Sequence, residues 1–345
     1  MNEKKRRALC AFLAVCSAAG LLAGCGGAEE TAEAEGAALV QSAGEGEELP
    51  GGDLGPEVDL GALLDEAVPL AGAPAISTVL HPVASGAQVQ KNASAVIDYS
   101  NAKDGYVMAA WLGGGTPKLK VLVKGPSGTT YQYNLRTDGQ YDTFPLSDSS
   151  GTYTVGVYQN VSGTQYATVL AATVNAALND EFAPFLRPNQ YVNFTDGSAA
   201  VAKAAELCAG AADNLDKVTK VYNYVINNLT YDKQKAQTVQ SGYLPNVDET
   251  LASRKGICFD YASLMSAMLR SQGVPVKLVV GYTGGAYHAW INVYSEKDGW
   301  IDGKIYFDGT TWKLMDPTFA SSAKQSEAIM QYIGNGSNYA AKYLY

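Results

Sequence analysis

Residues 256–270 read GICFDYASLMSAMLR, and the helix that this stretch predicts is the element from which the fold can be inferred. The stop signals Gly273 and Pro275 follow it. Its buried face is predicted to contain Ala262, Met265 and Leu269. Cys258 therefore stands in the first turn, where free backbone N–H groups and the helix dipole favour the nucleophilic thiolate. Cys258 is a candidate nucleophile, and the alternative is an inert buried cysteine.

Short strands follow the helix, so helices come before sheet and the order is that of an α+β domain. Strands are expected at 276–282, 288–294, 304–307 and 311–316. Alternation in the second of these places Ala289, Ile291 and Val293 on one face and His288, Trp290 and Asn292 on the other. His288 thus begins one strand, and Asp316 ends another.

Cys258, His288 and Asp316 are the parts of a Cys-His-Asp triad. The thiol needs a base to take its proton and return it to a leaving amine, and the imidazole needs a carboxylate to fix its tautomer. The alternatives are a strand histidine with a structural role and an aspartate that starts a turn before Pro317.

Three separated blocks resemble the bacterial transglutaminase-like superfamily over about residues 215–320. They are residues 255–275 with KGICFDYA, AMLR and GVP, then HAW at 288–290, then DPTF at 316–319. The family usually has Trp after Asp-Pro-Thr, whereas this chain has Phe319. The resemblance implies a papain-like fold with Cys258 as nucleophile, His288 as general base and acid, and Asp316 as the orienting acid.

The resemblance also implies what the enzyme would do. The family contains cysteine peptidases, amidases and protein-glutamine acyltransferases, as well as catalytically inactive members. The expected substrate is a peptide, a protein or a peptidoglycan stem, and the alternative function is a wall-binding or adhesion module that retains the fold. The backbone N–H of Cys258 should be one oxyanion donor, and the second is not assigned. We expect no cofactor and no metal site, because no His or Cys cluster has ligand spacing and no calcium-loop pattern occurs.

The N-terminus predicts export. Four basic residues at 4–7 precede an apolar run at 8–23, which is the pattern of a signal peptide over residues 1–24. The following Leu22-Ala23-Gly24-Cys25 resembles the lipobox of bacterial lipoproteins, in which the cysteine sulfur is lipidated. We expect Cys25 to anchor an outward-facing protein to the bacterial cell membrane, with ordinary cleavage or an uncleaved anchor as alternatives.

Charge excludes some partners. Removal of residues 1–24, which carry four basic side chains and Glu3, would lower the formal net charge from −9 to −12. Nucleic acid is not an expected partner, because it demands clusters of Lys and Arg. Residues 25–80 are acidic, contain no sustained hydrophobic period and predict a disordered tether.

Residues 86–177 are predicted to form an antiparallel β-sandwich of immunoglobulin-like type, without the Cys and Trp hallmarks of antibody domains. Strands are expected at 93–99, 105–112, 118–124, 129–135, 151–159 and 165–175. In the third of these, alternating Lys residues predict one wet face. Tyr131, Tyr133, Tyr141 and Tyr158 are expected to be exposed, as strand formers or as a binding face.

The catalytic domain is expected at 195–345, in a chain of 345 residues long enough for about two domains. Residues 182–194 contain two prolines and predict a linker or an extended cover. Helical patterning follows, with Val201, Ala205 and Cys208 on one face and an amphipathic stripe over 218–229. Cys208 at this spacing predicts an ordinary buried cysteine, and His81 a structural or solvated side chain.

Overall fold

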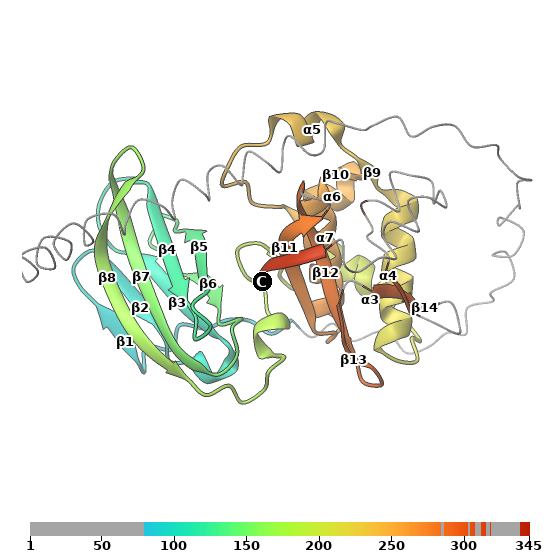
Figure 1. Cartoon of the computed structure of the whole chain (residues 1–345), viewed down its shortest axis with the longest axis horizontal. Helices are drawn as coiled ribbons and strands as arrows, with labels where there is room; N and C mark the ends of the chain where they lie inside the picture. The colour runs from blue at the N-terminus through green and yellow to red at the C-terminus, as the bar shows by residue number, and fades with distance from the viewer. Residues whose placement is uncertain (1–78, 284–285, 303, 308–311, 315–317, 319–338) are drawn as a thin grey trace, which may run out of the picture.

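The computed structural model describes residues 79–283, 286–302, 304–307, 312–314, 318 and 339–345. Figure 1 shows two halves side by side, with strands β1 to β8 in one half and the helices and later strands in the other. The predicted signal peptide, Cys25, almost all of the acidic tether and Asp316 lie outside the described residues. None of the helices in the described part of the chain is long and apolar enough to cross a membrane.

The N-terminal half consists of two four-stranded antiparallel sheets. The first has the order β1-β2-β3-β6, from Val89–Lys91, Ala95–Asp98, Tyr106–Trp111 and Asp142–Pro145. The second has the order β5-β4-β7-β8, from Thr130–Asn134, Leu119–Lys124, Gly151–Ser162 and Gln165–Ala176. Tyr133 of one sheet packs on Phe144 of the other with ring centroids 5.0 Å apart. The immunoglobulin-like type of this pair of sheets stays a prediction.

Two strands of this half were not predicted from the sequence, and three side chains are buried where exposure was expected. Strands β1 and β6 are short and polar, and β6 ends in a proline, so neither carries a clear alternating pattern. Lys120 was expected on a wet face but is 7% exposed, and its ammonium lies 5.1 Å from the centroid of the Tyr166 ring. Tyr131 and Tyr133 were expected to be exposed but are 3% and 1% exposed.

The second half contains short helices around one central helix. In chain order they are α3 (Ala199–Leu207), α4 (Asn214–Asn228), α5 (Lys233–Thr238), α6 (Val247–Ser253) and α7 (Cys258–Arg270). Every residue of α7 is buried, because α3, α4, α6 and two strands of the following sheet pack around it. The predicted helix at 258–270 is therefore confirmed, and Gly273 follows it with a φ of +76° that favours glycine.

An antiparallel sheet with the order β13-β12-β11-β16 covers α7. Its strands are β11 (Val276–Thr283), β12 (Ala286–Ser295), β13 (Gly299–Ile301) and β16 (Tyr339–Leu344). Two smaller pairs complete the half, a parallel pair of β9 (Thr230–Tyr231) with β10 (Lys255–Gly256) and an antiparallel pair of β14 (Lys304–Phe307) with β15 (Trp312–Leu314). The predicted order of helices before sheet is confirmed.

Arg270 ties the end of α7 to its surroundings. Its guanidinium is 0% exposed and donates to the main-chain oxygens of Arg187, Val276 and Tyr345. Burial lowers the pKa of Arg270 to about 9. The planar fork of donors binds three backbone oxygens from separate parts of the chain, which fixes the relative positions of the helix, the strand and the preceding segment.

The segment at 182–194 is a cover rather than a loose linker. It contains a short 3-10 helix, η3 (Ala183–Phe185), and then Val192 and Phe194, which are buried in the same hydrophobic cluster as α7. Lys277 of β11 lies 3.7 Å above the centroid of Trp300, and Phe182 and Phe185 also pack on that ring. These contacts fasten the segment to the sheet.

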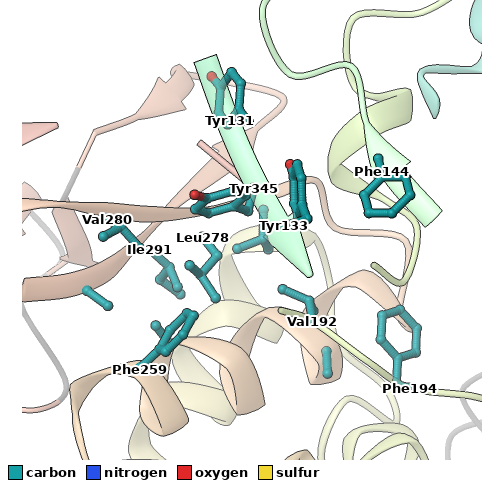
Figure 2. Packing of buried hydrophobic residues seen from close by; sticks show 14 of the residues in the cluster. Tyr131, Tyr133, Phe144, Val192, Phe194, Phe259, Leu278, Val280, Ile291 and Tyr345 are labelled. Carbon is teal, nitrogen blue, oxygen red and sulfur yellow. The ribbon is translucent and has the colours of Figure 1, made fainter. Parts of the chain in front are cut away.

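An aromatic cluster joins the two halves. Figure 2 shows Tyr345 beside Tyr131 and Tyr133 of β5, and its ring centroid lies 5.7 and 5.8 Å from theirs. Tyr191 stacks on Tyr133 at 5.5 Å and meets Tyr345 at 4.6 Å. The side chain of Gln190 also bonds both the N–H and the C=O of Asn134. The halves therefore share one continuous core.

Candidate active site

Cys258 is the first residue of α7, as the sequence predicted. Cys258 is only 4% exposed, and its thiol is free rather than part of a disulfide. The first backbone N–H groups of a helix lack acceptors within the helix, so they and the helix dipole stabilise negative charge at this position. The main-chain N–H of Cys258 belongs to this set.

A buried carboxylate fixes the start of α7. Asp260 is 0% exposed and accepts a 2.8 Å hydrogen bond from the backbone N–H of Ile257, which precedes the helix. Lys235 Nζ lies 2.8 Å from the same oxygen, and the Tyr243 hydroxyl donates to the other oxygen at 2.6 Å. Burial, followed by the hydrogen bond to Asp260, raises the pKa of Tyr243, so this hydroxyl remains a donor.

Gly256 allows this cap to form. A Cβ at Gly256 would lie 2.6 Å from the Cβ of Asp260, which no real pair of side chains tolerates. Only glycine lets the strand β10 run this close to the first turn of α7. The Gly-Ile-Cys-Phe-Asp sequence is thus explained by backbone approach and capping around the thiol. The role of Asp260 was not predicted, although an acid three residues after a helix N-cap is a recognised capping signal.

His288 lies in β12 opposite Gly281 of β11 and is 6% exposed. Strand β12 packs directly on α7. The imidazole is nearly parallel to the ring of Trp290, with centroids 6.3 Å apart. Both faces of β12 are buried, because Ala289, Ile291 and Val293 are at most 1% exposed and the alternating set of His288, Trp290 and Asn292 is at most 6% exposed.

A cavity of about 550 Å³ lies near the start of α7, although neither Cys258 nor His288 is among the residues that line it. Ile257 and Phe259, the neighbours of Cys258, line it, and so do Tyr287 and Ala289, the neighbours of His288. Its opposite wall comes from the N-terminal half, through β4, β5 and residues 135–137. Segment 239–243 closes a third side. This cavity could not be predicted from the sequence, because its walls come from distant parts of the chain.

The second described cysteine differs from Cys258. Cys208 ends α3, is 3% exposed and packs in the hydrophobic cluster. Burial raises the pKa of its thiol to about 11, although Lys217 and Lys220 act in the opposite direction. A neutral buried thiol is inert at pH 7, which agrees with the structural role expected for Cys208.

His81 has a partner that the sequence did not reveal. Its Nε2 lies 2.6 Å from Asp196 Oδ2, and both side chains are more than half exposed. This exposed pair contributes little to stability. Among the described residues, no group of three or more His, Cys, Asp or Glu side chains is placed to hold a metal ion.

The second half of the chain is similar to known proteins. Residues 201–317 match the model of the transglutaminase-like superfamily. YebA of Bacillus subtilis, whose function is uncharacterised, is 33% identical over 110 residues, which are 26% of this chain and 15% of that protein. A protein-glutamine gamma-glutamyltransferase of Pseudomonas aeruginosa is 27% identical over 104 residues, which are 26% of this chain and 14% of that protein. Both matches thus span a small part of each relative.

A solved structure from Cytophaga hutchinsonii, provisionally described as a cysteine protease, aligns with a TM-score of 0.36 at 16% identity. The alignment covers 70% of this chain and 83% of that one.

Proposed function

We propose that the protein is a cysteine enzyme that cleaves or transfers amide bonds through a thioester, because residues 201–317 match the model of the transglutaminase-like superfamily. Its substrates are peptides, proteins or cell-wall peptides. The observation that carries the proposal is a thiol at the start of a buried, capped helix, next to a strand with a histidine and a cavity large enough for peptide side chains.

The proposed reaction begins when Cys258 Sγ attacks the carbonyl carbon of an amide. His288 takes the thiol proton and delivers it to the nitrogen as the C–N bond breaks, so the amine leaves neutral. Asp316 orients the imidazole and stabilises its cation. The N–H of Cys258 binds the developing oxyanion. Water or a second amine then attacks the thioester and releases Cys258, which gives hydrolysis or acyl transfer.

The proposal includes the place of the enzyme. A signal peptide over 1–24 and a lipid on Cys25 would hold it on the outer side of the membrane, with residues 25–80 as a tether. Metabolic labelling with a palmitate analogue should mark the wild-type chain and leave Cys25→Ala unlabelled. Equal labelling of both chains would contradict the anchor.

Thiol chemistry tests the catalytic proposal. Iodoacetamide at pH 7 should alkylate Cys258 faster than it alkylates a model thiol, and Cys258→Ala should remove this fast phase. Cys208→Ala is the matched control and should leave it intact, because the Cys208 thiol is buried and protonated. A Cys258 that reacts no faster than the model thiol would favour a noncatalytic wall-binding module instead.

Mass spectrometry of a library of Gln- and Lys-containing peptides separates the two reaction types. Shortened peptides indicate a peptidase, whereas cross-linked products with loss of ammonia indicate an acyltransferase. Neither product should form with Cys258→Ala, and product formation by that variant would contradict the role of Cys258.

A further inference from the structure

The position directly across the sheet from His288 has no side chain. His288 of β12 pairs with Gly281 of β11, and paired residues of an antiparallel sheet point to the same face. Trp290 follows on that face of β12 and stands diagonally across from the glycine. A Cβ at Gly281 would lie only 2.9 Å from Trp290 Cη2, so the indole takes the place that a side chain of β11 would occupy. The imidazole of His288 is therefore flanked by this indole.

The indole of Trp290 is itself held in one arrangement. Its ring packs against the main chain at Gly281 and against the ring of Tyr339 in β16, with ring centroids 5.2 Å apart and an angle of 74° between the rings. Trp290 is only 4% exposed. An aromatic side chain rotates about two bonds, and contacts of this kind exclude most of its rotamers. Trp290 thus presents a fixed plane to its neighbour.

The imidazole of His288 lies along that plane. The two rings are 19° from parallel, with centroids 6.3 Å apart. Rotation of the imidazole toward β11 would bring it against the indole, so the indole restricts its orientation. Orientation matters for a general base, because one ring nitrogen must point at the proton that it takes. Lys277, which lies opposite Asn292, and Asp302, which accepts from Asn292 at 2.8 Å, stand further along the same face.

We propose that Trp290 is a positioning residue for the general base: its indole, packed over Gly281 and held by Tyr339, fixes the orientation in which His288 takes the proton of Cys258. This inference rests on the proposed function, because it assigns a residue that acts through His288 in the same reaction. Trp290 transfers no proton itself. Its loss should therefore weaken the pairing of thiol and imidazole while the thiol keeps its place at the start of α7.

The ratio of alkylation rates at pH 6 and pH 9 measures this pairing. Iodoacetamide forms an S–C bond with the thiolate and releases iodide, and peptide mass reads the rate at Cys258. An unpaired thiol with the ordinary pKa of about 8.5 reacts about 200-fold more slowly at pH 6 than at pH 9, because little thiolate is present at pH 6. A thiolate paired with an imidazolium keeps most of its reactivity, so the wild-type rates should agree within about tenfold. Access to the thiol affects both rates equally and cancels in the ratio.

Trp290→Leu removes the ring and keeps an apolar side chain. Its ratio of the pH 6 rate to the pH 9 rate should fall about tenfold or more below that of the wild type, and Trp290→Phe, which keeps a ring, should recover part of the loss. Trp111→Leu is the matched control, because Trp111 is 5% exposed and lies in β3 of the N-terminal half. It should leave the ratio unchanged. An equal fall in both leucine variants would mean a general loosening of the core and would contradict the inference.

Tyr339→Leu supplies a second variant that spares the core, because Tyr339 is half-buried. It releases one side of the indole and should lower the ratio by about threefold. Tyr294→Leu is its control, since Tyr294 is half-buried on β12 but packs on Phe182 and Trp300 instead. Equal ratios in these two variants would refute the support from Tyr339.

The wild-type ratio separates failure of the inference from failure of the proposed function. A wild-type Cys258 that shows the ratio of an unpaired thiol would contradict the proposed function and this inference with it. A wild-type ratio within about tenfold of one, unchanged in Trp290→Leu, would overturn the role of Trp290 alone.

Discussion

Replacement of Asp260 should both destabilise the first turn of α7 and lower the reactivity of the Cys258 thiol. In the wild-type protein the buried carboxylate receives three donors, from Ile257 N–H, Lys235 and Tyr243. Asp260→Asn keeps one acceptor oxygen but turns the other position into a donor, and it removes the charge that pairs with Lys235. Asp260→Ala leaves all three donors without an acceptor.

The magnitude follows from these contacts. A hydrogen bond to a buried charged group contributes about 1.5–3 kcal/mol, and breaking a buried ion pair by removing one partner costs about 3–5 kcal/mol. The side chain of Lys235 is 28% exposed, so water compensates part of its loss. We therefore expect Asp260→Asn to lower the free energy of unfolding by about 2 kcal/mol and Asp260→Ala by about 3–4 kcal/mol.

Urea unfolding followed by circular dichroism measures this change, and the rate of iodoacetamide labelling measures the state of Cys258. Asp216→Asn is the control, because Asp216 also caps a helix and pairs with a lysine, Lys220, but lies at the surface. Its cost should stay below about 1 kcal/mol. A loss of less than about 1 kcal/mol in Asp260→Ala, or a labelling rate equal to that of the wild type, would refute the reasoning.

Three further predictions concern the framework around the site. Arg270→Met removes the guanidinium donors from the main-chain oxygens of Arg187 and Val276 and one of the two donors to that of Tyr345, and should cost about 3–5 kcal/mol in urea unfolding. Arg270→Lys should recover only part of this loss, because lysine lacks the planar fork. Burial raises the pKa of Tyr131 to about 12, so the folded state gains stability below pH 10 that is lost as the pH rises from 10 to 12, by about 1.4 kcal/mol per pH unit. Burial also raises the pKa of other tyrosines, such as Tyr153 and Tyr191. Tyr131→Phe should therefore lower the slope of unfolding free energy measured at pH 9, 10 and 11 by the share of one tyrosine. Gly281→Ala places a methyl group against the main-chain oxygen of Ala340 and 2.9 Å from Trp290, so hydrogen exchange of the β16 amides should become faster.

Local patterns in the sequence predicted the elements that carry the candidate site. The apolar spacing and stop signals located α7, and the β-branched run and alternation located β11 and β12, because each pattern reports burial of a single element. The first position of the helix followed from the same argument. The prediction for Asp316 stays untested, since this residue lies outside the described part of the chain.

Relations between distant elements could not be predicted. The alternating pattern predicts that Tyr131 and Tyr133 share a face of β5. It does not predict that Tyr191 and Tyr345 cover that face. The partners of Asp260 come from two preceding segments with no periodic link to α7. The cavity has the same origin, because only the packing of the two halves creates it.

The aromatic cluster between the halves limits how this protein can be divided or recombined. A fragment that began at residue 195 would lack Tyr191 and the whole of β5, and would expose Phe259 and Tyr345 to water. Such a bare aromatic surface promotes aggregation. The segment that matches the superfamily is therefore no independent module here, and in gene fusions and recombination the N-terminal sheets must be inherited with it.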